Sequence, residues 1–337
     1  MTELTADPPV PPGPGRQRPA AIRAVPLRHP WRWVAAAVVV LIGAGIIDIF
    51  VTAPQLHWSV VGQYLFDDRI MQAALVTVYL TAIAMVVGVG LGVLMAVMRL
   101  STNRVMSSVS WLYIWFFRGT PVLVQLFFWW NIATILPSLS IGIPFTHIAW
   151  SESTNALVTP LLAAILGLGL NEAAYMAEIV RAGIISVDQG QTEAAHALGM
   201  KRSLVMRRIV LPQAMRVIIP PTGNETISML KTTSLAYIVT LHELFTVQQD
   251  ISNFNYKIIE LVIVASIWYL AMSSVLTVFQ YYIERHFARG SVRGLPPTPM
   301  QRLRRMLFQF HAAPPFGSAA EPDGEPWLPP AMPHSGM

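Results

Sequence analysis

The sequence contains no cysteine and few charged residues, and both scarcities narrow what the protein can be. Without cysteine there is no disulfide scaffold, no thiolate metal site and no cysteine nucleophile. Only 12% of the 337 residues are Asp, Glu, Lys or Arg, whereas 54% are apolar. An average soluble domain carries about 25% charged residues. The chain therefore has too little polar surface to cover a soluble globule, and we expect the lipid bilayer to be its solvent.

Two further patterns are missing, and the net charge has a simple explanation. The eight histidines are scattered, and neither HExxH nor another close ligand spacing joins them, so we expect no metal site. No G-x-x-x-x-G-K-[ST] phosphate loop is present, so we expect no ATP binding by this chain. The net charge of +5 could indicate nucleic-acid binding in a soluble protein. Here the placement of the basic residues gives a better explanation, and no nucleic-acid partner is expected.

Six stretches are apolar enough to cross a bilayer, which takes about 20 mostly apolar residues. They lie at about 33–52, 71–98, 112–136, 157–180, 217–240 and 258–282. The fifth stretch is the weakest, because it is interrupted by Pro220, Pro221, Asn224, Glu225 and Lys231. Backbone broken by proline at membrane depth needs neighbouring helices or a wet cavity to satisfy its polar groups. The fifth stretch is therefore expected to line a pathway.

The basic residues predict the orientation of these spans. Twenty of the 23 Lys and Arg residues fall on one side when the chain crosses six times. They cluster before residue 33, in 99–118, in 181–216 and after 284. Loops rich in Lys and Arg stay in the cytoplasm, so both termini are predicted to be cytoplasmic.

The cytoplasmic loop between the fourth and fifth spans reads DQGQTEAAHALGMKRSLVMRRIVLP. Asp188 can cap a first short helix, and Gly199 suits the left-handed residue that ends it. Ser203 can cap a second helix, which Pro212 ends or bends. The result is a basic helix–turn–helix, and the residues alone leave two roles open. It could dock into a groove of a partner protein, or it could lie on anionic lipid.

Several motifs in the chain resemble those of a known family. The loop carries the spacing E-A-A, three residues, G, nine residues, I-x-L-P, in Glu193, Ala194, Ala195, Gly199, Ile209, Leu211 and Pro212. This spacing is similar to the EAA loop of permease subunits of bacterial ATP-binding-cassette (ABC) importers. Further segments resemble those of polar amino acid permeases: Phe117 to Pro121 with Gln125, Ala174 to Arg181, Gly190-Gln191, Asn224-Glu225 and Lys231 to Leu235.

The resemblance implies an all-α integral membrane protein of the bacterial cell (plasma or inner) membrane. Residues 70–285 would form the five-helix core of a type I importer permease, with the coupling loop at 188–212. Residues 31–52 would add one transmembrane helix before this core. Outside this region the composition, and not the resemblance, predicts a disordered cytoplasmic tail at residues 1–30 and a Pro-rich cytoplasmic tail at residues 286–337. The EAA match favours docking over lipid contact.

The resemblance also implies the partners. Separate ATPase subunits would bind ATP and Mg²⁺ and dock on the coupling loop, so this chain would carry no cofactor and would not be an enzyme. A second permease protomer, identical or paralogous, would complete the pathway, and an extracytoplasmic binding protein would deliver a polar amino acid or close analogue.

Polar residues inside the spans are candidates for the substrate pathway, because a charge at mid-membrane costs about 2.5–3.5 kcal/mol on insertion scales. They are Glu172, Tyr175, Asn224, Lys231, Thr233 and Ser234. A carboxylate such as Glu172 suits an ammonium group, and Lys231 suits a carboxylate. The alternative is structural pairing, of Glu172 or Glu225 with Lys231, or of Glu178 with Arg181.

A bend is expected at the cytoplasmic end of the third span, where glycine and proline follow an arginine. The residues are Arg118, Gly119, Thr120 and Pro121, and the sequence leaves open whether they support a gate or only packing. Two rival functions are a secondary, ion-coupled amino acid transporter and a membrane enzyme. The first needs no docking loop, and the second has no recognisable catalytic signature.

Overall fold

A computed structural model describes residues 30–142, 149–287 and 300 of the chain. The chain divides into two compact units, residues 49–296 and residues 1–48 with 297–337. The predicted tails at 1–30 and 286–337 lie almost entirely outside the described residues. In the second unit, the described part is the first 19 residues of α1 (Pro30–Thr52) and Met300. Trp33–Thr52 of α1 is long and apolar enough to cross a membrane, as expected for the first span.

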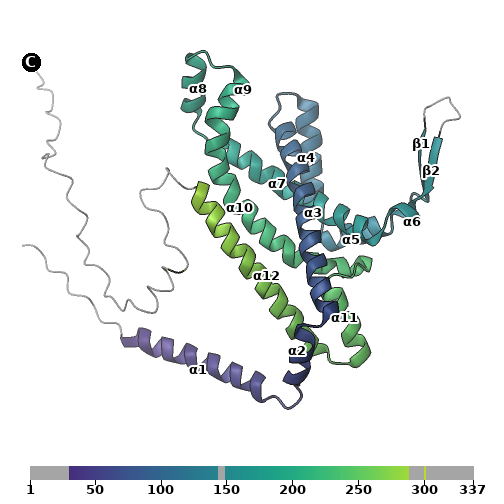
Figure 1. Cartoon of the computed structure of the whole chain (residues 1–337). Helices are drawn as coiled ribbons and strands as arrows, with labels where there is room; N and C mark the ends of the chain where they lie inside the picture. Colours follow the sequence, from purple (N-terminus) through teal and green to yellow (C-terminus); the bar gives the residue numbers. More distant parts are fainter. Residues whose placement is uncertain (1–29, 143–148, 288–299, 301–337) are drawn as a thin grey trace, which may run out of the picture. The chain divides into compact units, whose positions relative to one another are not determined.

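The unit of residues 49–296 is a helical bundle (Figure 1). Its membrane-length helices are α3 (Asp68–Arg99), α7 (Pro160–Ile185), α10 (Leu211–Thr232) and α12 (Ile258–Phe287). Shorter helices are α2 (Trp58–Leu65), α4 (Arg104–Gly119), α5 (Val122–Trp130), α6 (Thr154–Leu157), α8 (Gln189–Ala197), α9 (Arg202–Val205) and α11 (Leu244–Asn255). Three helical turns of other types are η1 (Ile132–Thr134), the π-helical η2 (Met206–Val210) and the 3₁₀-helical η3 (Thr233–Val239).

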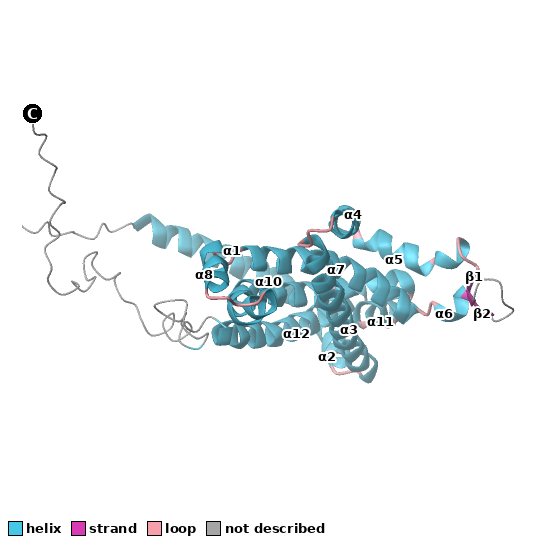
Figure 2. Cartoon of the chain, turned by 90° about the horizontal axis from the view of Figure 1, so that it is seen from above, coloured by secondary structure: helices cyan, strands magenta, loops and turns pink. Residues whose placement is uncertain are grey.

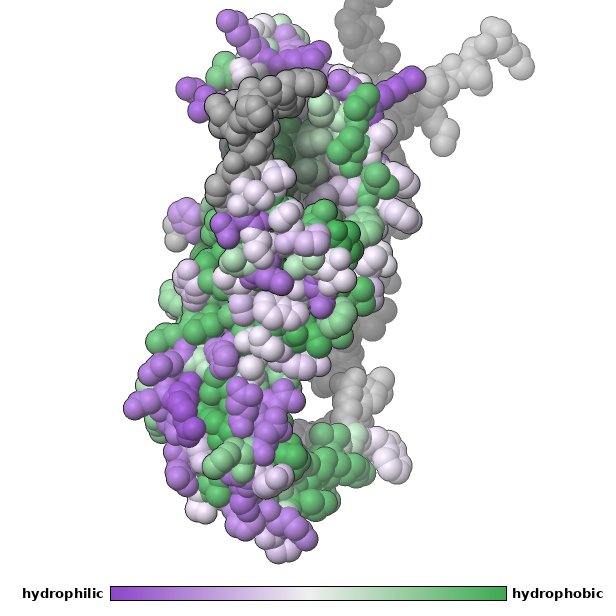
Figure 3. All heavy atoms as spheres, turned by 90° about the vertical axis from the view of Figure 1, so that its right-hand side faces the viewer, coloured by the Kyte–Doolittle hydropathy of each residue, from purple (hydrophilic) through white to green (hydrophobic). Residues whose placement is uncertain are grey.

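Hydrophilic residues gather towards the two ends of one face of the bundle, and apolar, intermediate and some hydrophilic residues are mixed between them (Figure 3). Within the described residues, four helices are long and apolar enough to cross a membrane, namely α1, α3, α7 and α12, and the bent pair α4–α5 makes a fifth if it is counted as one span; α10 is not among them.

The central pair of the bundle is α3 and α7, which approach closely through glycines. A Cβ added at Gly92 would lie 2.5 Å from Cβ of Met176, and one at Gly88 would lie 2.5 Å from Cγ of Glu172. Small residues let membrane helices come into direct contact in this way. Gly88 and Gly92 therefore serve helix packing, as their position inside an apolar span indicates.

The prediction of a single third span at 112–136 is wrong in its geometry. The chain there forms α4 and α5, which meet at an angle of 101° around Gly119 to Pro121. Pro121 cannot donate a backbone hydrogen bond, and its ring disfavours helical geometry in the residue before it. The bend that we predicted at these residues is confirmed.

The fifth predicted span is also different from expectation. Proline does not break it: α10 runs unbroken from Leu211 to Thr232, through Pro220 and Pro221, and η3 follows. Neighbouring helices can hold such a helix together. Nε2 of Gln280 in α12 donates to O of Pro220 (3.3 Å), and Gly223 lies against the same side chain.

One small sheet departs from the all-helical prediction. Strand β1 (Ser138–Gly142) pairs antiparallel with β2 (Ala149–Ser153), and Leu139 lies opposite Glu152. Polar and apolar residues alternate along β1, as in a strand with two different faces. The hairpin projects from the end of the bundle beyond α5 and α6 (Figure 2).

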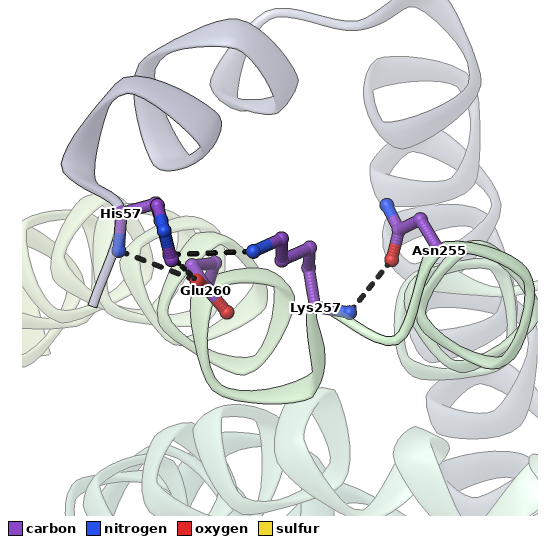
Figure 4. A network of polar contacts seen from close by, with 4 residues as sticks. All are labelled: His57, Asn255, Lys257 and Glu260. Atoms are coloured by element: carbon purple, nitrogen blue, oxygen red, sulfur yellow. Dashed lines mark hydrogen bonds and ion pairs between the residues drawn. The ribbon is translucent and has the colours of Figure 1, made fainter. Parts of the chain in front are cut away.

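A polar network joins the start of α2 to the start of α12. Oε1 of Glu260 accepts a hydrogen bond from the backbone N–H of His57 (3.3 Å) and lies 3.1 Å from Nδ1 of the same residue. Nζ of Lys257 lies 3.3 Å from this Nδ1, and the backbone N–H of Lys257 donates to Asn255 (Figure 4). Glu260 is 4% exposed, so the network compensates a buried carboxylate.

A second buried carboxylate, Glu243, caps α11. Its oxygens accept hydrogen bonds from the backbone N–H groups of Phe245 (2.9 Å) and Thr246 (2.8 Å) and from the hydroxyl of Tyr269 (2.9 Å) in α12. Glu243 is fully buried. The carboxylate therefore has a structural role, because its hydrogen bonds tie α11 to α12.

Candidate functional site

A cavity of about 540 Å³ opens where the α4–α5 bend meets α7 and α10. It is lined by Arg118, Gly119, Thr120, Pro121, Val122, Asn171, Glu172, Tyr175, Glu225, Ser228, Met229 and Thr232. The lining carries one guanidinium and two carboxylates. The volume falls within the range of about 300–1,000 Å³ that is usual for small-molecule sites.

The cationic side of the cavity is Arg118, the last but one residue of α4. Its guanidinium carbon lies 5.1 Å from the centre of the Tyr175 ring, within cation–π distance. Tyr175 stands on the neighbouring helix α7, so this contact joins the bend to α7.

The acidic side of the cavity is formed by Glu172 in α7 and Glu225 in α10. Glu172 is 4% exposed, and its Oε1 has no hydrogen-bond partner among the described residues. Glu225 interacts electrostatically with Glu172, by repulsion, and with Arg118, by attraction. A buried carboxylate oxygen without a donor is costly. A cationic ligand in the cavity would supply that donor.

Of the six candidate pathway residues, Glu172 and Tyr175 line the cavity, and the other four lie elsewhere. The Oδ1 atom of Asn224 accepts a hydrogen bond from Nε2 of Gln280 (3.0 Å), on the side of α12. Thr233 is fully buried and donates to O of Leu230, and Ser234 donates to O of Lys231. These hydroxyls bond their own helical turn.

The structural pairings suggested by the sequence have different outcomes. Lys231 is exposed, and within residues 30–142 and 149–287 it forms no ion pair with Glu172 or Glu225. The pairing of Glu178 with Arg181 is confirmed, with Nη2 of Arg181 2.6 Å from Oε2 of Glu178. These two residues are therefore engaged with each other.

Three polar lining residues of α10 were not among our candidates. Glu225, Ser228 and Thr232 follow one another at spacings of three and four, which places them on one face of a continuous helix. This periodicity was visible in the sequence, but the expected break at Pro220 and Pro221 concealed it.

The loop at 188–212 forms the two short helices that the sequence predicts, α8 and α9. Oδ1 of Asp188 accepts from the backbone N–H of Gly190 (2.7 Å) and caps α8, and Gly199 follows α8 with φ +78°. The prediction that Ser203 caps α9 is wrong, because Lys201 takes that position without a side-chain bond. Pro212 does not end the second helix either, because α9, η2 and α10 follow one another without a gap and Pro212 is the second residue of α10.

The loop has a packed side and an open side. Ala195, Val205 and Val210 form a small apolar cluster with residues at the end of α7, Ile184 and Val187. Glu193 and Ala194 are exposed, and Leu198 is 84% exposed. Ile209 is half-buried, whereas Leu211 and Pro212 are exposed. The EAA residues are thus divided, with Ala195 facing inward and its two neighbours outward.

No set of three or more His, Asp or Glu side chains in the described part of the chain could hold a metal ion.

Comparison with known proteins gives consistent matches. Residues 88–289 match the family described as binding-protein-dependent transport system inner membrane component. The chain is 50% identical over 285 residues to the arginine transport system permease protein ArgU of Corynebacterium glutamicum, covering 84% of this chain and 89% of that protein. It is 37% identical over 235 residues to the nopaline transport system permease protein NocM of Agrobacterium fabrum, covering 68% and 93%.

A solved structure, a crystal structure of an amino acid ABC transporter with histidines, is also similar. The two chains are 31% identical with a TM-score of 0.57, and the match covers 67% of this chain and 97% of that one. The solved structure thus shares the fold of the bundle.

Proposed function

We propose an arginine-type substrate and a pathway through the cavity for this chain, which belongs to the family of binding-protein-dependent transport system inner membrane components. It is a multi-pass membrane protein and the permease subunit of an amino acid ABC transporter, not an enzyme. The relatives favour this function over the ion-coupled alternative.

The observation that carries the proposal is the charge of the cavity. Arg118 suits the α-carboxylate of an amino acid, and Glu172 suits an ammonium or guanidinium group. With Glu225, the lining has two carboxyl groups and one guanidinium, which complements a substrate with two cationic groups and one carboxylate, of net charge +1. L-arginine has this charge, and the relative from Corynebacterium is named for arginine transport.

Coupling to a separate ATPase would run through α8 and α9. Glu193, Ala194 and Leu198 offer an exposed docking surface, with Gly199 shaping the turn. Ala195 packs on the end of α7, and η2 leads directly into α10. Because α7 and α10 both line the cavity, a movement of the loop would shift Glu172 and Glu225 together. ATP and Mg²⁺ would be bound by the ATPase, and this chain would carry no cofactor.

The finer topology is part of the same proposal. Five spans would form the permease core at 70–285, with the span at 31–52 added before it and both termini in the cytoplasm of a bacterium. A second permease protomer would close the pathway, and an extracytoplasmic binding protein would deliver the substrate. The distribution of Lys and Arg supports this orientation.

The test is uptake of radiolabelled L-arginine into proteoliposomes that contain the chain with its ATPase and binding protein. We expect uptake to require internal ATP and to persist when ion gradients are collapsed. In Glu172→Gln the apparent KM for arginine should rise about tenfold or more, since hydrogen bonds to charged groups contribute about 1.5–3 kcal/mol.

The matched control is Glu152→Gln, which removes a carboxylate from the exposed strand β2. It should transport like the wild type. Uptake driven by an ion gradient, or an unchanged KM in Glu172→Gln, would contradict the proposal.

A further inference from the structure

The bend between α4 and α5 creates an unsatisfied backbone acceptor. In a continuous helix the carbonyl of Phe117 would accept from the N–H of residue 121, but that residue is Pro121, which has none. A buried carbonyl without a donor costs about 1–3 kcal/mol. A stable bend at this depth therefore needs another donor.

Two side-chain amides supply it. Nε2 of Gln125 in α5 donates to O of Phe117 (3.0 Å), and Nδ2 of Asn171 in α7 donates to the same oxygen (2.9 Å). Nε2 of Gln125 also lies 3.1 Å from O and 2.8 Å from Oγ1 of Thr120. We call Gln125 and Asn171 with the Phe117 carbonyl the amide clip. It connects α4, α5 and α7 at one point.

The amide clip is adjacent to the cationic group of the cavity. Arg118 directly follows Phe117, so the direction of the Phe117 carbonyl fixes the backbone from which the Arg118 side chain leaves. Tyr113, one turn earlier, donates from its hydroxyl to O of Leu170 (2.7 Å), next to Asn171. Both bonds hold the end of α4 against α7, where the Arg118 guanidinium lies over Tyr175.

We propose that Gln125 and Asn171 are positioning residues: by binding the Phe117 carbonyl that Pro121 leaves free, they hold the α4–α5 bend at the angle that directs Arg118 into the cavity. This inference rests on the proposed function in one respect, namely that Arg118 receives the carboxylate of the substrate. Gln125 itself does not line the cavity, so it acts through Arg118.

The geometry predicts an unusual order of severity for substitutions of Gln125. The side chain is 5% exposed, and its Nε2 faces three acceptor oxygens. In Gln125→Glu a carboxylate oxygen would face the same three oxygens with no proton to donate. In Gln125→Leu the donor is lost without added repulsion. Glutamate, the closer match in shape, should therefore be the more harmful substitution.

The matched control is Asn131→Asp. Nδ2 of Asn131 donates to O of Phe127 (2.8 Å), so the bond is of the same type and joins residues of α5 and its cap, but it is exposed and away from the cavity. Asn131→Asp and Gln125→Glu both change an amide to a carboxylate. A general effect of acidic substitutions near α5 would appear in this control as well.

The first measurement reports the bend without transport. Because the chain has no cysteine, spin labels can be attached at Val109→Cys in α4 and Val124→Cys in α5, both exposed positions, and their distance distribution measured in lipid nanodiscs. We expect one narrow distribution in the otherwise unchanged chain and in Asn131→Asp. Gln125→Glu should broaden or shift it. An unchanged distance distribution in Gln125→Glu would contradict the proposal that the amide clip holds the α4–α5 bend.

The second measurement is ATP-driven L-arginine uptake by the reconstituted transporter. In Gln125→Glu the apparent KM should rise at least tenfold while the amount of assembled complex stays the same, with a smaller rise in Gln125→Leu. A fall in assembled complex with unchanged KM would mean that Gln125 only supports packing, and would overturn the proposal. If the unsubstituted transporter took up no arginine, the proposed substrate would be wrong. The spin-label distances would still show whether the amide clip holds the α4–α5 bend.

Discussion

Gly88→Ala tests whether close packing of α3 on α7 sets the position of Glu172. The added Cβ would lie 2.5 Å from Cγ and 2.8 Å from Cβ of Glu172, so either the helices separate or the side chain shifts. Overpacking of this kind costs about 1–3 kcal/mol. Alanine in place of glycine in a helix returns about 0.5–1 kcal/mol.

Gly90→Ala is the matched control in the same helix, because no atom lies within 4 Å of its added Cβ. This variant should gain about 0.5–1 kcal/mol from helix propensity alone. The two variants should thus differ by about 1–3 kcal/mol. That difference corresponds to at least a few degrees in melting temperature at about 2–4 °C per kcal/mol.

The assay combines thermal unfolding of the purified protein in detergent with L-arginine uptake. Gly88→Ala should melt below Gly90→Ala, and its apparent KM should rise because Glu172 moves. Equal melting temperatures and equal KM values would refute the packing argument. A lower melting temperature with an unchanged KM would show that Glu172 does not contact the substrate.

Two further predictions concern the loop and the cap of α11. Gly199→Val should impair coupling to the ATPase, because the left-handed φ of +78° at this position costs a residue with a Cβ about 1–2 kcal/mol. The amount of ATPase that co-purifies with the permease should therefore fall. The control Gly62→Val, on the exposed face of α2, should have little effect on co-purification. Tyr269→Phe removes one donor from the buried carboxylate of Glu243 and should lower the free energy of unfolding by about 1.5–3 kcal/mol, measured by denaturant unfolding. An unchanged stability would contradict the role of this bond.

Much of the helical framework could be read from the sequence. The spans expected at 71–98, 157–180 and 258–282 correspond to α3, α7 and α12 within a few residues at most ends. Continuous apolar runs of this length have few alternatives in a membrane, because every backbone group must be bonded within its own helix. The two ends of α8 were equally local, because Asp188 caps its start and Gly199 follows its end in the left-handed region.

The expected break in the fifth span was wrong because contacts with other helices outweighed the local effect of proline. Two consecutive prolines predicted a break in the fifth span, yet α10 continues because α7 and α12 pack along it and Gln280 bonds the Pro220 carbonyl. The same error hid the helical spacing of Glu225, Ser228 and Thr232 and directed attention to Lys231, which is exposed.

The sequence by itself determined the lipid solvent, the spans that became α1, α3, α7 and α12, and the two ends of α8, since hydropathy and capping act through neighbouring residues along the chain. Only the tertiary structure decided which polar groups share a cavity, because the angle of the α4–α5 bend and the contact of α3 with α7 depend on residues far apart in sequence. The amide of Asn171 meets the carbonyl of Phe117 across 54 positions. A contact of that kind has no signature in local composition, and it brings Arg118 to the carboxylates of α7 and α10.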